Sequence, residues 1–186
     1  MNRNQDNAAH FDRVRREAEL LVSREQVERA VERMADEISR DLARADPLAV
    51  CVLVGGLVVF GPLVSRFSFP CDLSYLHATR YRNTTRGHDL TWTAPVHGGV
   101  RDRVVLVVDD ILDEGNTLAG IEHALREEGA ARVIKAVLVR KQRPVPPVTE
   151  ADYVGLEIPD RYVFGWGMDY HGKFRNLSAI YAVSEN

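Results

Sequence analysis

One segment constrains the fold more than any other: a valine-rich run that ends in carboxylates and continues into a glycine and a helix-like stretch. It reads Val104-Val-Leu-Val-Val-Asp109-Asp110-Ile-Leu-Asp113-Glu-Gly-Asn-Thr-Leu118. A continuous apolar run is typical of a strand that is covered on both faces, as in the parallel sheets of α/β proteins. Such open sheets bind ligands at the carboxyl ends of their strands. We therefore expect an α/β domain with its ligand site where this run ends.

The rest of the chain alternates between helix and strand patterns. A capping box at Ser23 and Gln26 opens a helix whose apolar residues recur at helical spacing until Asp46-Pro47. The other expected elements are strands at 48–54, 71–77, 103–108 and 133–139, a helix at 57–67 whose middle is disfavoured by Pro62, and a helix at 117–128 closed by Gly129. This alternation predicts a mostly parallel sheet flanked by helices, in one domain that spans residues 1–186.

Composition excludes several classes of protein. The chain is 45% hydrophobic and 27% charged, which excludes disorder over most of its length. Its 27 acidic and 24 basic residues give a net charge of −3, without the positive excess that non-specific nucleic-acid or membrane binding requires. The first twenty residues hold no signal-peptide core, and the longest apolar stretch, 48–63, is broken by glycines and Pro62. Cys51 and Cys71 fit no metal spacing, so we expect reduced thiols in a cytoplasmic protein.

Two segments depart from the alternation. Residues 80–100 are polar, with three glycines and several basic side chains, and loops of this length are uncommon unless they are functional. The segment is either a lid over an anionic ligand or a solvated hairpin, and its length favours the lid. From Asp152 onward, aromatic residues and glycines predict a small appended subdomain of short strands.

The residues after the central run suit a phosphorylated sugar. Backbone amides of the turn at 114–117 can cradle a phosphate, with the Thr117 hydroxyl as a further donor. Asp109 and Asp110 suit sugar hydroxyls or Mg²⁺. The plainer alternatives are that the pair begins a loop and that Asp113 caps the helix. Three acids beside a phosphate would repel it unless a cation or hydroxyls lie between them. The lysine of a Walker-type loop is missing, which disfavours nucleoside triphosphate hydrolysis.

Three motifs together resemble those of a known family. Residues 104–118 resemble the phosphoribosyl pyrophosphate signature of type I phosphoribosyltransferases, and Cys51-Val-Leu-Val-Gly55-Gly56 resembles their pyrophosphate loop. The segment 154–170 resembles the purine hood of the hypoxanthine-guanine phosphoribosyltransferases. With Lys141 and Phe174-Arg-Asn-Leu177, the resemblance covers residues 20–184. It implies the type I fold, with a purine-binding hood formed by the N-terminal segment and about residues 152–186.

The resemblance also implies an activity: Mg²⁺-dependent purine salvage. Hypoxanthine or guanine would react with phosphoribosyl pyrophosphate to give IMP or GMP and pyrophosphate, in a homo-oligomer (dimer or tetramer) with no nucleic-acid or membrane partner. A lysine that donates to a carbonyl oxygen favours 6-oxopurines over adenine, whose amino group offers a donor where an acceptor is needed. The alternatives are a xanthine-preferring relative and a non-catalytic regulator that senses phosphoribosyl pyrophosphate and binds nucleic acid. The acidic balance disfavours the regulator.

Individual residues receive roles from the resemblance. Asp113 matches the catalytic group near the imidazole nitrogen of the base, and it opens the 5′-phosphate loop with Glu114, Gly115, Asn116 and Thr117. The ribose and magnesium are assigned to Asp109 and Asp110, with Asp169 as a second metal ligand. The residues assigned to pyrophosphate are Val54, Gly55, Gly56 and Arg175. Tyr81 matches the tyrosine of the family's mobile loop, and the residues assigned to the purine are Lys141, Tyr162 and Val163.

Some positions depart from the family pattern or allow a plainer interpretation. Val54 stands where many relatives carry lysine, Arg80 precedes Tyr81 where serine is usual, and Asn116 replaces a frequent lysine. Lys141 would otherwise be part of a solvated basic strand end, and Gly55-Gly56 a plain turn. Tyr162 would otherwise belong to the core, as we expect for Trp166. The six histidines show no zinc-ligand spacing.

Overall fold

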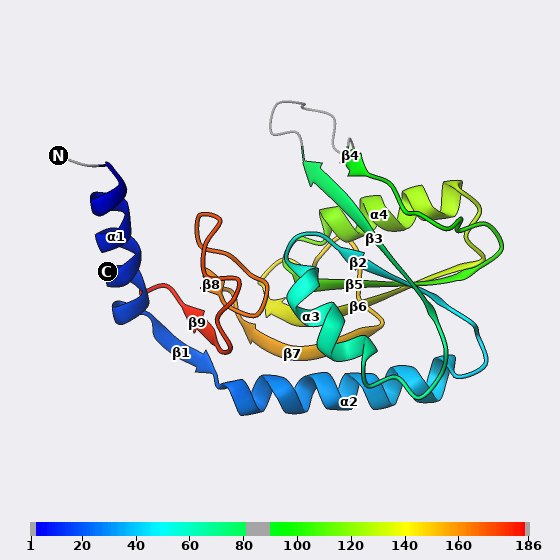
Figure 1. Cartoon of the computed structure of the whole chain (residues 1–186), viewed down its shortest axis with the longest axis horizontal. Helices are drawn as coiled ribbons and strands as arrows, with labels where there is room; N and C mark the ends of the chain where they lie inside the picture. Colours follow the sequence, from blue (N-terminus) through cyan, green and yellow to red (C-terminus); the bar gives the residue numbers. More distant parts are fainter. Residues whose placement is uncertain (1–2, 81–89, 185–186) are drawn as a thin grey trace.

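A computed structural model describes residues 3–80 and 90–184, with side chains described at 8–78 and 94–184. Within these residues the chain forms a six-stranded sheet of order β4-β3-β2-β5-β6-β7 (Figure 1). All neighbouring pairs are parallel except β3 with β4, so the expected mostly parallel sheet is confirmed. Its strands are β2 (Leu48–Val52), β3 (Asp72–Arg80), β4 (Leu90–Ala94), β5 (Val104–Leu112), β6 (Arg132–Gln142) and β7 (Tyr153–Pro159).

Helices cover both faces of this sheet. The helices α2 (Arg24–Leu42) and α3 (Gly56–Val64) pack on one face and α4 (Asn116–Glu127) on the other. The strand β5 is apolar throughout its first half because both of its faces are covered. Leu106 and Val108 face α2 and α3, while Val105 and Val107 face α4. Burial on both faces therefore produces the sequence pattern. None of the helices in the described ranges has the length and apolar character needed to cross a bilayer.

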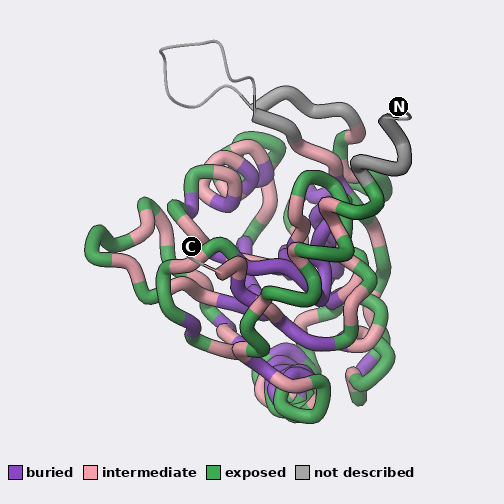
Figure 2. The backbone as a smooth tube through the Cα atoms, turned by 90° about the vertical axis from the view of Figure 1, so that its left-hand side faces the viewer, coloured by how far each residue is buried: buried purple, intermediate pink, exposed green. Residues whose placement is uncertain are grey.

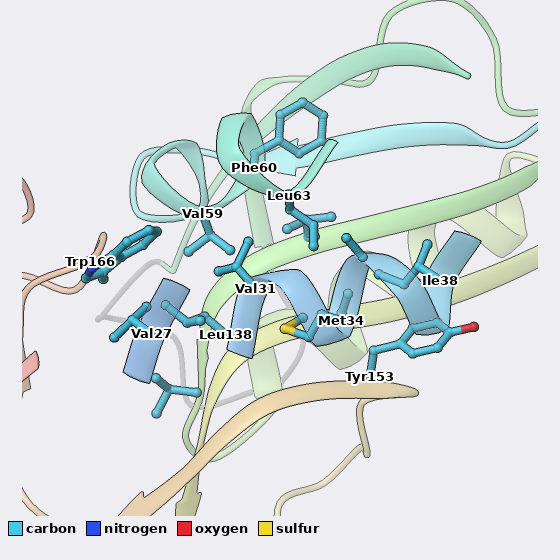
Figure 3. Packing of buried hydrophobic residues seen from close by; sticks show 14 of the residues in the cluster. Val27, Val31, Met34, Ile38, Val59, Phe60, Leu63, Leu138, Tyr153 and Trp166 are labelled. Atoms are coloured by element: carbon cyan, nitrogen blue, oxygen red, sulfur yellow. The ribbon is translucent and has the colours of Figure 1, made fainter. Parts of the chain in front are cut away.

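The helix α2 is held to the sheet by one apolar side. Its start is confirmed as a capping box, in which the Gln26 amide donates to Ser23 Oγ at 3.3 Å and the Ser23 amide donates to Gln26 Oε1 at 2.8 Å. Met34 and Ile38 are fully buried and lie with Leu138 and Tyr153 in the main core (Figure 3). Figure 2 shows the buried residues gathered on the strands and on one side of α2.

Two parts of the large sheet differ from the sequence prediction. Residues 90–94 lie in the segment expected to be a lid or a solvated hairpin, with the lid favoured, and they form the edge strand β4, which pairs antiparallel with β3. The segment 80–100 thus has hairpin arms, while residues 81–89, including Tyr81, lie outside the described residues. The strand β5 continues through Asp109 and Asp110 to Leu112, because its ladder with β6 extends to Leu112 opposite Arg140. Pro62 lies inside α3, in its last turn, where it cannot donate an amide hydrogen bond to Val58 O, and the helix nevertheless continues to Val64.

A second, smaller sheet joins the two ends of the described chain. It has the order β1-β9-β8, with β1 (Glu19–Val22), β9 (Ile180–Ala182) and β8 (Val163–Phe164). The strand β7 belongs to the large sheet instead, because Tyr153, Gly155 and Ile158 are buried there, so the small sheet takes its C-terminal strands from residue 163 onward. This differs from the expected subdomain that starts at residue 152.

The helix α1 (Arg3–Glu17) was not predicted and lies beside the small sheet (Figure 1). Its Phe11 ring packs edge-on against Phe174, with ring centroids 5.6 Å apart, and against Tyr170 at 6.2 Å. His10 stacks on the same Tyr170 at 5.9 Å. The contact therefore involves the aromatic residues of the loop between β8 and β9.

Candidate active site

Two adjacent cavities open at the carboxyl ends of β5 and β6. The first, of ≈ 230 Å³, is formed by the end of β5 and the turn into α4. The second, of ≈ 300 Å³, lies between that strand end, β6 and the loop after β8. They share Asp110, Ile111 and Asp113. The predicted site residues in the first cavity are Asp109, Asp110, Asp113, Glu114, Gly115 and Thr117, and those in the second are Asp110, Asp113, Lys141, Tyr162, Val163, Asp169 and Arg175.

Asp109 and Asp110 are neighbouring buried carboxylates, with 8% and 7% of their surfaces exposed. The Asp110 amide donates to Asp109 Oδ1 at 2.9 Å, and Arg175 Nη1 lies 3.7 Å from Asp110 Oδ2. Burial raises the pKa of both carboxyls, and the charge of Asp110 raises the pKa of Asp109 further. The pair is therefore short of positive charge, which a bound cation would supply.

The donor set fits Mg²⁺ held jointly with substrate oxygens. Carboxylate oxygens are the hard ligands that this ion prefers, and it commonly takes one or two of them together with phosphate oxygens and water. In the ranges for which side chains are described, no three His, Cys, Asp or Glu side chains converge on one point. Asp169 is engaged elsewhere: it pairs with Arg175 Nη2, and its Oδ2 accepts the Gly172 amide at 2.7 Å.

The turn into α4 has the geometry of an anion-binding helix start. Gly115 caps the helix with φ +80°, a left-handed conformation that favours glycine, and no side chain caps the amides. The alternative in which Asp113 caps α4 is therefore wrong. A Cβ at position 115 would lie 3.2 Å from Leu112 Cδ1 and from Pro147 Cβ. Asn116 does not line the cavity, since its Nδ2 donates to Glu114 Oε2 at 2.9 Å.

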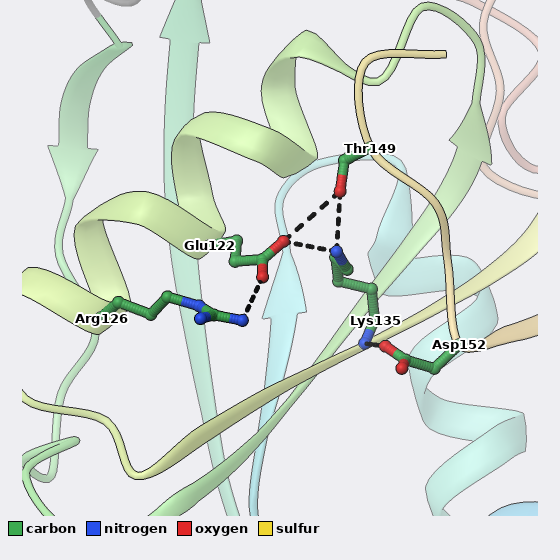
Figure 4. Close-up of polar contacts among 5 residues, drawn as sticks. All are labelled: Glu122, Arg126, Lys135, Thr149 and Asp152. Carbon is green, nitrogen blue, oxygen red and sulfur yellow. Dashed lines mark hydrogen bonds and ion pairs between the residues drawn. The ribbon is translucent and has the colours of Figure 1, made fainter. Parts of the chain in front are cut away.

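A buried polar network supports this turn from behind (Figure 4). Lys135, inside β6 and 8% exposed, pairs with Glu122 of α4 and donates to Thr149 Oγ1 at 2.7 Å. Burial raises the pKa of Glu122, but Lys135 and Arg126 together outweigh this effect and the net pKa is lowered. One residue before Thr149, the Val148 amide donates to Glu114 O at 2.9 Å. The network thus joins α4, β6 and the segment that contacts the turn.

Asp113 stands where the two cavities meet, with a cation on each carboxylate oxygen. Lys141 Nζ donates to Oδ2 at 2.8 Å, and Arg143 Nη1 donates to Oδ1. Partial burial raises the pKa of Asp113, but the hydrogen bonds from Lys141 and Arg143 together lower it below its ordinary value. The Lys141 side chain is only 12% exposed and also lies 3.7 Å from Asp160 Oδ1. Lys141 is therefore not part of a solvated strand end.

Aromatic residues border the second cavity. Tyr162 is 54% exposed at its wall, so it is not a core residue, and Val163 lies beside it. The Tyr162 and Tyr170 rings meet edge-on at 5.6 Å, which connects the cavity wall to the ring cluster under α1. Trp166 is buried as expected, and its Nε1 donates to Ser178 O at 2.7 Å.

The glycine segment after β2 packs tightly against the carboxylates. A Cβ at Gly55 would overlap the Asp110 side chain, and one at Gly56 would lie 2.8 Å from Val108 O. From the other side, a Cβ at Gly167 would overlap Gly55 O. These glycines are more than a plain turn, because three chain segments meet without room for a side chain. Val54 is 49% exposed, and the peptide bond before it is cis.

Sequence reasoning did not single out Lys135, Glu122, Thr149 or Arg143 for any role. A lysine within the apolar run 133–139 was the available signal, because lysine is almost never buried without a partner. For Arg143 the signal was its position two residues after Lys141, which places both side chains on one side of an extended chain.

A parallel sheet with paired carboxylates, a glycine turn and basic side chains at its carboxyl edge defines a class of α/β proteins that bind phosphorylated sugars or nucleotides. Within this class, the family described as "Phosphoribosyl transferase domain" matches residues 19–172. The chain belongs to this family. The match begins after α1, so this helix lies outside the matched segment.

Named relatives are similar over most of their length. The hypoxanthine-guanine phosphoribosyltransferase of Bacillus subtilis is 28% identical over 162 residues, which are 87% of this chain and 90% of that protein. The hypoxanthine-guanine-xanthine phosphoribosyltransferase of Tritrichomonas foetus is 27% identical over 172 residues, or 90% and 92%. A crystal structure of a hypoxanthine-guanine phosphoribosyltransferase from Bacillus anthracis superposes with a TM-score of 0.82 at 28% identity, covering 89% of this chain and 98% of that one.

Proposed function

We propose that this chain is a purine salvage enzyme that transfers the 5-phosphoribosyl group from phosphoribosyl pyrophosphate to hypoxanthine or guanine. The products are pyrophosphate and IMP or GMP. The observation that carries the proposal is the position of Asp113, which joins a glycine-capped anion cavity to a cavity walled by Tyr162 and Lys141. A nucleoside monophosphate has the same order of parts: phosphate, sugar and base. The relatives named hypoxanthine-guanine phosphoribosyltransferase, described above, support this proposal.

Each part of the substrate has a matching set of residues. The 5′-phosphate takes the amides of the turn at 114–117, and the ribose hydroxyls take Asp109 and Asp110. The purine stacks on Tyr162, with Lys141 donating to its 6-oxygen and the Val163 backbone at its edge. A donor at that position rejects the amino group of adenine.

The chemistry follows from where charge develops. Departure of pyrophosphate leaves an oxocarbenium-like sugar, and Arg175, which lines the second cavity, would neutralise the leaving group. Asp109 and Asp110 would hold Mg²⁺, which supplies neutralising charge for the same group. Asp169, the further ligand in this proposal, would first have to leave Arg175 and the Gly172 amide. Asp113 takes the proton from the imidazole nitrogen of the base as the new bond to carbon forms. Its lowered pKa keeps it ionised and able to accept that proton.

A homo-oligomer, dimer or tetramer, completes the proposal. Leu57, Leu73 and Tyr75 are large apolar residues with 57%, 58% and 44% of their surfaces exposed. Leu73 and Tyr75 alternate on β3 opposite Ala49 and Cys51, which belong to the core on the α3 side of the sheet. A second copy covering these residues would remove apolar surface from water.

The proposed compartment is the cytoplasm. The two free cysteines support a reducing compartment of this kind.

The test is a pyrophosphate-release assay with phosphoribosyl pyrophosphate and Mg²⁺. Hypoxanthine, guanine, xanthine and adenine are supplied singly and then in competition. We expect turnover of hypoxanthine and guanine and none of adenine. Preference for xanthine would favour the specificity of the Tritrichomonas foetus relative, whose name includes that base. The enzyme proposal fails if no 6-oxopurine is turned over. If, in addition, the chain shifts the mobility of a nucleic acid in response to phosphoribosyl pyrophosphate, the non-catalytic regulator becomes the better interpretation.

A further inference from the structure

Asp113 has two cationic partners, and the proposed reaction uses only one of them. Lys141 occupies Oδ2 at 2.8 Å and Arg143 occupies Oδ1. Lys141 has a second role in the proposed reaction, because it also lines the cavity proposed for the purine. Arg143 has no second role of this kind, because it does not line that cavity and forms its ion pair with Asp113.

The backbone explains why both cations reach the same carboxylate. Lys141 lies near the end of β6, and the Arg143 amide donates to Lys141 O at 3.1 Å, which fixes the two residues in one local turn. Within this turn both side chains reach Asp113. The intervening and preceding residues point the other way: Gln142 donates to Glu157 at 3.1 Å, and Arg140 pairs with Glu150 and Glu157.

The two roles of Lys141 compete when a base binds. When a base binds, Asp113 Oδ2 must face the imidazole nitrogen and accept its proton. Lys141 has three N–H donors, but a hydrogen bond from a cation opposes protonation of the oxygen that accepts it, so Lys141 must release Oδ2 as it turns to the purine 6-oxygen. With one cation alone, Asp113 would lose its anchor at the moment when its position matters most. The second cation removes this conflict because it holds the other oxygen.

We propose that Arg143 is a positioning residue that holds Asp113 by Oδ1 while Lys141 moves to the purine and Oδ2 accepts the proton. The inference rests on the proposed function. In the step, the ring nitrogen bonds to the anomeric carbon, pyrophosphate leaves with the electron pair of the broken C–O bond, and the imidazole proton passes to Oδ2. Arg143 donates to Oδ1 throughout and transfers nothing. The other charged groups around this contact are Lys141 on Asp113 itself, Asp160 near both Lys141 and Arg143, and Glu114 near Arg143.

The direction in which Arg143→Gln moves the pKa of Asp113 follows from the charges. A guanidinium stabilises the ionised carboxylate, so Arg143→Gln raises the pKa of Asp113. The base is then protonated at a higher pH, and the acid limb of the kcat/KM profile moves to higher pH. We expect roughly a tenfold loss of kcat/KM at the acid end of the profile, and a much smaller change at its alkaline end.

The experiment compares Arg143→Gln, Arg143→Lys and Arg140→Gln with the wild-type chain. The pH dependence of kcat/KM is measured with hypoxanthine as the varied substrate, and phosphoribosyl pyrophosphate titrates identically in all four proteins. Carbon-13 NMR of the aspartate carboxyls, assigned by Asp113→Asn, follows Asp113 in the ligand-free protein without any need for activity. Arg140→Gln is the matched control because Arg140 faces away from the site.

The proposal expects Arg143→Gln to move both the kinetic limb and the Asp113 carboxyl titration to higher pH. Arg143→Lys restores most of the wild-type profile, and Arg140→Gln changes neither. An equal loss of rate at every pH, or an Asp113 titration unchanged in Arg143→Gln, overturns it while leaving the enzyme intact. A wild-type chain that turns over no purine overturns the proposed function itself, and the two failures are therefore distinct.

Discussion

Lys141 Nζ donates a 2.8 Å hydrogen bond to Asp113 Oδ2, although 28 residues of chain separate them. Asp113 follows β5 and Lys141 lies near the end of β6, so the parallel pairing of these strands brings the two residues together. This contact lies at the junction of the two cavities. It therefore places a proton acceptor and a hydrogen-bond donor side by side at the wall of the second cavity.

Replacing Asp113 with Asn removes the proton acceptor and keeps its size. We expect kcat to fall by about 10²–10⁴-fold, the usual contribution of a general base, with little change in the affinity for phosphoribosyl pyrophosphate. Single-turnover rates and equilibrium binding of that substrate separate the two effects. If affinity falls while the rate of the bound complex is kept, Asp113 is a ligand and not a base.

The neighbouring acids predict a conflict between stability and function. Because burial and the charge of Asp110 raise the pKa of Asp109, its stabilising contribution is present at low pH and is lost as pH rises through the folded-state pKa. Asp109→Asn should therefore raise the unfolding free energy by about 1–2 kcal/mol at neutral pH, and the gain should vanish in acid. Melting curves across pH measure this. The same variant should lose the stabilisation that Mg²⁺ and phosphoribosyl pyrophosphate give the wild type, and a lower melting temperature at neutral pH would contradict the account.

The network behind the phosphate turn predicts a defect that is both structural and kinetic. Lys135→Met leaves Glu122 without its main partner, which should cost about 3 kcal/mol in urea unfolding. It also releases Thr149, next to the residue that contacts Glu114, so KM for phosphoribosyl pyrophosphate should rise more than KM for the base.

A second variant separates these two effects. Lys135→Met combined with Glu122→Leu removes both charges and should recover most of the stability. The raised KM should persist in the double variant, because the bond to Thr149 is still missing. A KM that recovers together with stability would show that the network acts only on the fold.

Two glycines give a matched pair of substitutions. A Cβ at Gly55 would overlap the Asp110 side chain and lie 3.0 Å from Arg175 Nη1, so Gly55→Ala should displace both and abolish measurable turnover. A Cβ at Gly61, six residues further on and within α3, would have no neighbour within 4 Å. Gly61→Ala should keep full activity and add about 0.4–1 kcal/mol of stability. Steady-state kinetics and thermal melts of the two proteins decide this, and an active Gly55→Ala enzyme would contradict the packing described.

Local patterns predicted the elements whose sequence and environment agree. The capping box at Ser23 located α2, and the apolar runs located β2, β5 and β6, because burial on both faces selects valine and leucine. Long-range pairing explains the errors. Asp109 and Asp110 have the composition of a loop, but the ladder to β6 carries β5 through them. The helix α1 offered few apolar residues, and its packing on Tyr170 and Phe174 depends on contacts distant in sequence.

The residues of the candidate site also fall into those that the sequence revealed and those that only long-range contacts reveal. Asp109, Asp110 and Asp113 were singled out because they follow an apolar run, at the edge where open sheets bind ligands, and Lys141 was singled out by the family resemblance. Arg143 and Lys135 were missed because their importance lies in what they contact, Asp113 and Glu122, and not in their own segment.

The most direct measurement of the central claim is a crystal structure of the chain with GMP bound. The account predicts the phosphate within hydrogen-bond distance of the amides at 114–117, the ribose hydroxyls on Asp109 and Asp110, and the purine against Tyr162 with its 6-oxygen on Lys141. A phosphate bound away from that turn, or a ribose that contacts neither acid, would contradict it.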